Sequence, residues 1–172
     1  MKILYMGCKR NGQNSANPED TVIGVDSKKF PDVDVVHDME MAPLPFENES
    51  FDVVYSNHNL EHVVNRAQLV EEIWRILKPG GIFDVTVPHH SNPVGKRLDH
   101  HGCFSMQSFD SLVPQDREKY ENRRFSVAER HIRLLRPFGF LEPVVDRCPD
   151  FYEWRLSALV PAVEVRFKLK KV

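Results

Sequence analysis

Hydrophobic and polar positions follow their clearest pattern in the second quarter of the chain. Residues 51–55 form a short apolar run of β-branched and aromatic side chains, which predicts a strand buried on both faces of a sheet. Apolar side chains then recur every three or four positions over 63–77, which predicts a helix, and Asn65 and Gln68 have the spacing of a capping box at its start. A second apolar run follows at 82–87. A strand, a helix and a strand of these lengths predict a right-handed parallel crossover.

Weaker patterns predict the rest of the sheet. Short apolar runs at 2–7, 21–26 and 33–36 predict three more strands, with connections too short or too polar for ordinary helices. Residues 163–170 alternate between apolar and polar side chains, as in an antiparallel edge strand with one face in water. The sequence therefore predicts an α/β fold, with a Rossmann-like, mostly parallel sheet, an antiparallel C-terminal edge strand and reduced helices in its N-terminal half. One sheet face would then be thinly covered, and a homodimer could cover it.

The segment between these patterns is harder to assign. Ser105 could cap a helix. The pattern over 125–140 allows a helix or a partly exposed strand, and 141–145 predicts a sixth strand after a turn. Residues 151–160 are expected to form a short helix.

Composition indicates an ordinary globular protein. At 172 residues the chain is expected to form one domain, and its 28% charged and 41% hydrophobic residues are typical of that class. No apolar run is long enough to cross a membrane, so membrane insertion is not expected, and the first residues do not resemble a signal peptide. The cysteines, Cys8, Cys103 and Cys148, are odd in number and widely spaced, which favours free thiols and a cytoplasmic location.

Charge is divided unevenly along the chain. Residues 1–114 carry 10 basic and 16 acidic side chains, whereas residues 115–172 carry 13 basic and 9 acidic ones. An acidic half suits a cationic ligand and a basic half suits an anionic one, although a solvated basic face is the more ordinary interpretation. Nucleic acid is not expected as a partner, because acids interrupt the basic residues and no aromatic binding signature accompanies them.

Polar or glycine residues end each of the first five predicted strands. In open α/β sheets, ligands bind beyond the carboxyl ends of the strands, so these residues are expected to border one crevice. They are Gly7, Asp26, Asp38, Asn57 and His89.

Histidines and acids gather between residues 89 and 101. A metal site is conceivable there, and with it a metal-dependent hydrolase. However, no pair has the one-turn helical spacing that presents two ligands to one ion, and adjacent histidines such as His89 and His90 point opposite ways on an extended chain. The sequence therefore predicts no bound metal.

These features occur together in one known family. The run that carries the resemblance is LPF…SFDVVYSNHNLEHV…ILKPGG, between Leu44 and Gly81. It resembles class I S-adenosylmethionine-dependent methyltransferases of the type 11 kind, and most of all the small branch often found among surface-polysaccharide biosynthesis genes. The resemblance is good over residues 3–90. It implies one methyltransferase-like domain over 1–172, with a cofactor half at about 1–90, an acceptor-side segment at about 89–136, and S-adenosyl-L-methionine as cofactor.

The resemblance also implies roles for individual residues. Asp26 would accept hydrogen bonds from the ribose hydroxyls, Asp38 would accept from the adenine amine, and Met39 would pack on the adenine ring. The glycine turn departs from the family pattern, because Lys9 stands where a second glycine is usual. The expected cofactor-binding residues are Gly7, Cys8, Asp26, Ser27, Asp38, Met39, Asn57 and His58.

On the acceptor side, transfer of a methyl group to a hydroxyl requires a nearby base, for which histidine is the natural candidate. His62 matches a common family position and is expected to be a structural hydrogen-bonding residue. The resemblance implies O-methylation of a small hydroxylated acceptor, such as a sugar or a polysaccharide precursor. A degenerate, methyltransferase-like scaffold protein without activity is the alternative that Lys9 and the missing helices motivate. The expected catalytic candidates are His58, His89, His100 and His101.

Overall fold

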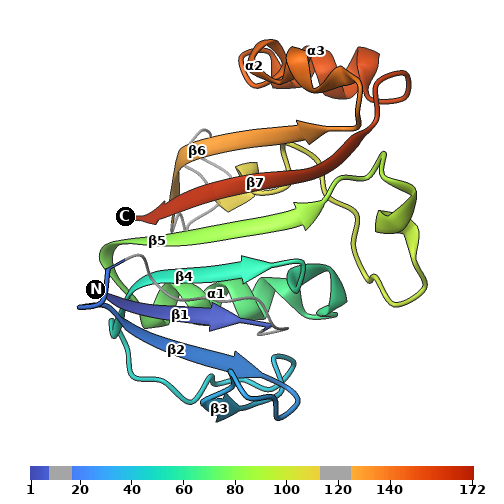
Figure 1. Ribbon diagram of the computed structural model, residues 1–172. Coiled ribbons are helices and arrows are strands. Elements are labelled where there is room, and N and C mark those ends of the chain that lie inside the picture. Colours follow the sequence, from blue (N-terminus) through green and yellow to red (C-terminus); the bar gives the residue numbers. More distant parts are fainter. Residues whose placement is uncertain (8–16, 113–124) are drawn as a thin grey trace.

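The computed structural model describes residues 1–7, 17–112 and 125–172. Within these ranges, seven strands form one sheet in the spatial order β3-β2-β1-β4-β5-β7-β6 (Figure 1). β1 to β5 are parallel, and β7 lies antiparallel between β5 and β6, which forms the outer edge. This arrangement confirms the predicted α/β class, the Rossmann-like sheet and the antiparallel C-terminal strand, but β6, and not β7, takes the edge position that was expected of the C-terminal strand. The strands are β1 (Lys2–Met6), β2 (Thr21–Asp26), β3 (Val35–Val36), β4 (Phe51–Asn57), β5 (Leu77–Pro88), β6 (Phe125–Leu134) and β7 (Ala162–Lys171).

The predicted parallel crossover between β4 and β5 is confirmed, with helix α1 at Arg66–Ile76. Asn65 caps α1, because its side chain accepts a hydrogen bond from the Gln68 backbone N–H at 3.4 Å. The other half of the predicted capping box differs, since the Asn65 backbone N–H donates to Glu40. The side chains that α1 buries against the sheet recur at the predicted three-to-four spacing: Leu69, Val70, Ile73 and Ile76.

The C-terminal third departs from the predicted order of elements. The sixth strand predicted at 141–145 is wrong, because a 3₁₀ turn, Phe138–Leu141, leads there into helix α2, Glu142–Val145. The Glu142 and Asp146 carboxylates accept hydrogen bonds from backbone N–H groups of β6, which fixes the helical segment against the end of that strand. β6 itself comes from the stretch in which the sequence allowed either a helix or a strand.

Other elements are shorter than predicted. β3 has two residues, and the helix expected from Ser105 is reduced to turns that include the 3₁₀ turn Asp110–Leu112. The helix expected within 151–160 is confirmed, as helix α3 (Pro149–Phe151) continues into a π-helical turn, Tyr152–Leu156. No helix in the described ranges is both long and apolar enough to span a membrane.

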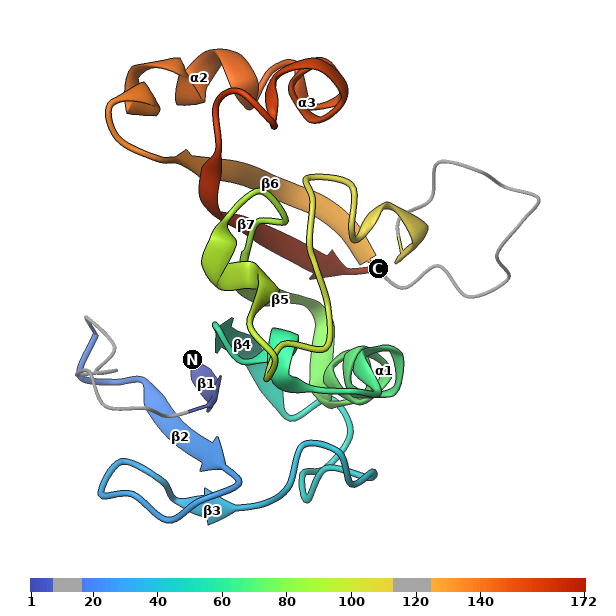
Figure 2. The same ribbon diagram turned by 90° about the vertical axis from the view of Figure 1, so that its right-hand side faces the viewer.

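The two faces of the sheet differ in their cover. α1 lies on one face (Figure 2), together with Met106 and Phe109 from the loop after β5, and the main core lies there. Among the described residues, no helix lies over β1, β4 and β5 on the opposite face, which we call the bare face (Figure 2). The prediction that 51–55 is buried on both faces is wrong, because Val53 and Tyr55 stay partly exposed. The strand register sets one row across the bare face: Tyr5, Tyr55, Asp84, Lys168 and Glu129.

Candidate functional site

A cavity of about 450 Å³ lies at the carboxyl ends of β1, β2 and β4. This is where an open parallel sheet binds ligands, and the volume is in the range of small-molecule sites. We call it the rim cavity. Its described lining residues are Gly7, Asp26, Ser27, Lys28, Phe30, Asn57, His58, Asn59, His62 and Asp99.

Gly7 and Asp26 form the part of the rim cavity beside β1 and β2. Gly7 has a φ of 74°, and its N–H donates to the Val25 carbonyl at 3.0 Å, so a left-handed turn begins where β1 ends. Asp26 is only 8% exposed. Its Oδ1 accepts hydrogen bonds from the Lys28 N–H at 3.0 Å and the Ser27 hydroxyl at 3.4 Å, while Oδ2 accepts none from the described residues. One oxygen of this largely buried carboxylate is therefore free of described partners and can accept hydrogen bonds from hydroxyl groups of a ligand.

His58 follows β4 in an unusual conformation. Its φ of 49° lies in the left-handed region, which a residue other than glycine seldom adopts, and its N–H donates to the Thr86 carbonyl at 2.9 Å. The imidazole bridges two carboxylates, with Nε2 2.8 Å from Glu164 and Nδ1 3.2 Å from Glu61. The hydrogen bonds to Glu164 and then to Glu61 raise the pKa of His58 to about 9. In this structure the ring is thus a cation at neutral pH, not a free base.

Five of the eight expected cofactor-binding residues line the rim cavity: Gly7, Asp26, Ser27, Asn57 and His58. Asp38 and Met39, which were expected to contact the adenine, do not line the rim cavity. Asp38 caps a turn by accepting from the Glu40 N–H at 3.0 Å, and Met39 is buried in the core. Cys8 lies outside the described residues.

His89 lies in a separate, closed network. Its fully buried ring has Nδ1 2.8 Å from the Ser91 hydroxyl and Nε2 3.0 Å from Glu153, and His90 binds the other Glu153 oxygen at 2.9 Å. The expectation that His89 and His90 point opposite ways is wrong, because both rings share one carboxylate. Burial opposes ionisation of Glu153, but hydrogen bonds from His89, the Met106 N–H and His90 outweigh it and lower its pKa to about 2.

The segment after β5 brings other groups to the site. Asp99 lines the rim cavity. His101 is exposed, and its backbone N–H donates to the Glu61 carbonyl at 2.7 Å, which holds this segment beside the turn after β4. The His100 ring meets the His62 ring edge to face, with centroids 4.7 Å apart. His100 and His101 do not themselves line the rim cavity.

Three residues that line the rim cavity were not predicted from the sequence: Lys28, Phe30 and Asn59. Each belongs to a connection just after β2 or β4, so the rule that marked the strand ends would have found them if it had been extended by a few residues. Phe30 also stands out as an aromatic residue in a polar stretch.

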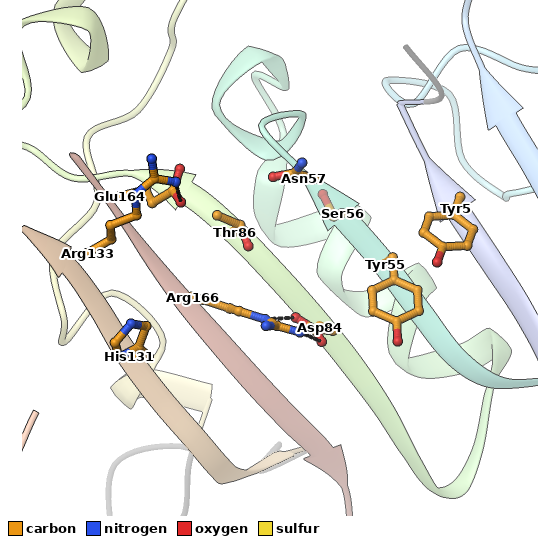
Figure 3. A pocket seen from close by; sticks show the side chains of 10 residues that line it. All are labelled: Tyr5, Tyr55, Ser56, Asn57, Asp84, Thr86, His131, Arg133, Glu164 and Arg166. Carbon is orange, nitrogen blue, oxygen red and sulfur yellow. Dashed lines mark hydrogen bonds and ion pairs between the residues drawn. The ribbon is translucent and has the colours of Figure 1, made fainter. Parts of the chain in front are cut away.

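A second cavity, also about 450 Å³, opens on the bare face (Figure 3). The Tyr5 and Tyr55 rings stack there, with centroids 4.7 Å apart. Arg166 donates to both oxygens of Asp84, from Nε at 2.7 Å and from Nη2 at 2.5 Å. Asn57 lines both this cavity and the rim cavity, so the two hollows meet at the end of β4.

Known proteins share parts of this sequence. Residues 11–85 match a family model described as a methyltransferase domain. A probable S-adenosylmethionine-dependent methyltransferase from Mycolicibacterium smegmatis is 41% identical over 61 residues, which are 36% of this chain and 23% of that protein. A demethylmenaquinone methyltransferase from Chlorobaculum parvum is 29% identical over 148 residues, 78% of this chain and 57% of that protein. The chain thus spans less than two thirds of the length of either relative.

The fold is shared more completely. The crystal structure of an S-adenosylmethionine-dependent methyltransferase from Mesorhizobium loti superposes with a TM-score of 0.58 at 15% identity, covering 98% of this chain and 90% of that one. Likeness at this level of identity establishes the fold. Residues 11–85 thus match the methyltransferase domain family, and the chain has the Rossmann-like fold found in S-adenosylmethionine-dependent methyltransferases.

Proposed function

We propose that this protein is an S-adenosylmethionine-dependent methyltransferase that binds its cofactor in the rim cavity. The observation that carries the proposal is the convergence on one cavity of a left-handed glycine turn, a buried acid at the end of β2 and polar residues at the end of β4. The match of residues 11–85 to the methyltransferase domain supports it.

The lining residues fit the parts of this cofactor. Asp26 would accept hydrogen bonds from the ribose hydroxyls through the oxygen that no described residue occupies. Phe30 would supply an aromatic face for the adenine ring, in place of the contacts first expected from Asp38 and Met39. The Asn59 side-chain Nδ2 is buried and has no hydrogen-bond partner among the described residues, so it would donate to a polar group of the cofactor.

Bound S-adenosylmethionine supplies a methyl group that its sulfonium already activates. The protein therefore has to align an acceptor with that group and exclude water, rather than activate the donor. Asn57 and His58 would border the methionine part, since they follow β4 at the junction of the two cavities. His62 and Asp99, from the segments after β4 and β5, would border the acceptor.

The proposed acceptor is a small hydroxylated molecule, such as a sugar or polysaccharide precursor, methylated on oxygen. An acceptor-side role for His100 and His101 is supported by their position beside the rim cavity, since the His100 ring contacts His62, which lines it. His89 is enclosed in its own network with Glu153. A ring carbon of a quinone is the competing acceptor class, because one relative is a demethylmenaquinone methyltransferase. A product screen with sugar nucleotides and quinones distinguishes these acceptors.

A cytoplasmic location and a homodimer across the bare face remain part of this proposal. Cys103 and Cys148 are exposed free thiols, as a reducing compartment allows. The Asp84–Arg166 pair is already formed within one chain, so a second copy would meet a polar face whose strongest charges are neutralised. Light scattering of the purified protein measures its oligomeric state directly.

Calorimetric titration with S-adenosylmethionine and S-adenosylhomocysteine tests the cofactor site. We expect binding, and we expect Asp26→Asn to weaken it roughly 10- to 100-fold, because a hydrogen bond to a charged group is worth about 1.5–3 kcal/mol. Asp32→Asn is the matched control, since Asp32 is exposed and does not line the cavity. Absence of heat and of a thermal shift with either ligand would favour the scaffold alternative. Equal affinities for both variants would remove the ribose role from Asp26.

A further inference from the structure

Three side chains beside the rim cavity have the arrangement of metal ligands. Glu61, His62 and His100 each offer one ligand atom, and these atoms all lie within 4.8 Å of one another. Glu61 and His62 come from the 3₁₀ turn Leu60–His62 after β4, and His100 comes from the loop after β5. The hydrogen bond from the His101 N–H to the Glu61 carbonyl holds these two segments together.

Two of these residues each have one buried atom of ligating type without a hydrogen-bond partner in the described part of the chain. Glu61 is 1% exposed, and its Oε2 is buried without a hydrogen bond there. The Nδ1 atom of His100 is also buried and unpartnered within the same ranges. A buried polar atom without a partner has lost its hydration with no hydrogen bond in return, so native proteins seldom leave one unpaired without a reason. Two such atoms of metal-ligating type in one cluster indicate a binding site for a cation.

The groups around the cluster hold the ligands in position for an ion. The Nδ1 atom of His62 lies 3.0 Å from the Asp99 carbonyl, and donation to that oxygen leaves the lone pair on Nε2. His58 binds the other Glu61 oxygen, Oε1, at 3.2 Å. Ligating histidines commonly donate their second N–H to a backbone carbonyl, and ligating carboxylates are commonly hydrogen-bonded in the same way.

We propose that Glu61, His62 and His100 bind a divalent first-row transition-metal ion at the wall of the rim cavity. Two imidazoles and one carboxylate suit Zn²⁺ and its neighbours, whereas Mg²⁺ and Ca²⁺ prefer oxygen ligands alone. Three protein ligands leave an open coordination position, and His62 is the ligand that also lines the cavity. Residues 89–101 alone predict no metal, because two of the proposed ligands, Glu61 and His62, lie far upstream of that stretch.

The second histidine–carboxylate cluster differs in that its carboxylate oxygens already have hydrogen-bond partners. In the group of His89, His90 and Glu153, both carboxylate oxygens already accept hydrogen bonds from the rings, and Nδ1 of His89 is bound to Ser91. Both Glu153 oxygens and both nitrogens of His89 therefore have partners without an ion. This contrast provides an internal control for the proposal.

The ion's contribution to chemistry rests on the proposed methyltransferase function, although the metal site itself does not. An acceptor hydroxyl bound at the open position would be polarised and would lose its proton more readily. The ion would thereby assist the deprotonation for which histidine alone was expected.

Calorimetric titration of the chelator-treated full chain with zinc chloride tests the site, alongside metal analysis of protein purified without chelator. We expect one Zn²⁺ per chain. His62→Asn and His100→Asn should each weaken binding at least about 100-fold, since removing even an outer-shell partner costs about 10- to 100-fold. The matched control is His101→Asn, which changes the neighbouring exposed histidine, and it should leave zinc affinity unchanged. His90→Asn, in the other cluster, should do the same.

The outcomes separate this inference from the proposed function. No zinc binding by the wild type, zinc binding that survives both His62→Asn and His100→Asn, or loss of zinc with His90→Asn would each overturn the metal site. Because His62 is exposed at the surface, its variant is expected to fold, and a thermal melt verifies this. The same samples are titrated with S-adenosylhomocysteine. Zinc binding without S-adenosylhomocysteine binding would retain the metal site and reject the cofactor site, and the reverse result would do the opposite.

Discussion

At the scale of single residues, Gly7 combines a backbone conformation that favours glycine with a place in the lining of the rim cavity. Its φ of 74° strains any other residue, and a Cβ there would lie 2.9 Å from side-chain atoms of Asn59. We expect Gly7→Ala to lower the free energy of unfolding by about 1–2 kcal/mol, the usual cost of a left-handed residue with a side chain. It should also weaken S-adenosylhomocysteine binding, because Asn59 has to move within the cavity lining.

Urea denaturation and calorimetry measure the two effects of Gly7→Ala. Gly139→Ala is the matched control, because Gly139 has no positive φ and an added Cβ would meet only the Glu142 carboxylate, at 3.5 Å. The control should keep ligand affinity. If Gly7→Ala bound the ligand as tightly as the wild type, the close approach of backbone and cofactor at this turn would be disproved.

Residue types in the sequence predicted only part of the rim cavity. Asp26 and Asn57 could be placed because the carboxyl ends of parallel strands share one edge of the sheet. The same rule also marked Asp38, but Asp38 does not line the cavity, because it begins a turn in which the Met41 N–H donates to its carbonyl at 3.0 Å. Met39, which only the resemblance assigned, lies within that turn and packs into the core. The pairing of Glu61 with His100 could not be predicted, because it depends on how two loops far apart in the sequence meet.

At the scale of elements, Glu153 connects three segments of the chain. It belongs to the turn after α3, binds the His89–His90 pair at the end of β5, and accepts the Met106 N–H at 2.7 Å. Its pKa is lowered from 4.5 to about 2, which corresponds to about 3 kcal/mol of folding stability. Because the folded-state pKa is the lower one, this stability is present above pH 4.5 and is lost as the pH falls towards 2.

We expect Glu153→Gln to destabilise the protein by about 3 kcal/mol at pH 7, and the difference from wild type to shrink steadily between pH 4.5 and 2. Urea denaturation at a series of pH values measures this. Glu47→Gln, which alters an exposed carboxylate, should give the wild-type profile. A Glu153→Gln penalty that did not change with pH would show that packing, and not ionisation, joins these segments.

Pattern strength decided which elements the sequence could predict. α1 has a long, regular apolar pattern with a capping residue, and it and its flanking strands form as predicted, although β5 begins at Leu77, five residues before the predicted strand. Residues 141–145 have only a short apolar run, which periodicity cannot assign to strand or helix, and tertiary hydrogen bonds to β6 made it helical. β6 was ambiguous for the same reason, since a partly exposed strand shows no single clear period.

At the scale of the whole molecule, the bare face explains how a sheet with so little helical cover remains stable. The row that crosses it is aromatic on β1 and β4 and charged on β5, β7 and β6, and its charged side chains form ion pairs. Asp84 pairs with Arg166, and Glu129 pairs with Lys168. A face of this kind can meet water without exposing a large apolar surface, so its stability does not require a covering layer.

The Asp84–Arg166 pair is the strongest test of this account. Asp84 has a side chain only 5% exposed, whereas Arg166 is 44% exposed, so losing the arginine leaves a buried carboxylate without its partner. We expect Arg166→Met to destabilise the protein by about 1–3 kcal/mol, the cost of an unsatisfied buried charged group in a partly solvated site. The double variant Asp84→Leu/Arg166→Met should recover most of that loss, because apolar groups of similar size can replace a buried pair with little change in stability. Urea denaturation of the three proteins, with light scattering to verify an unchanged oligomeric state, provides the measurement. A double variant less stable than Arg166→Met would mean that the bare face needs charge at this position for a reason other than mutual neutralisation.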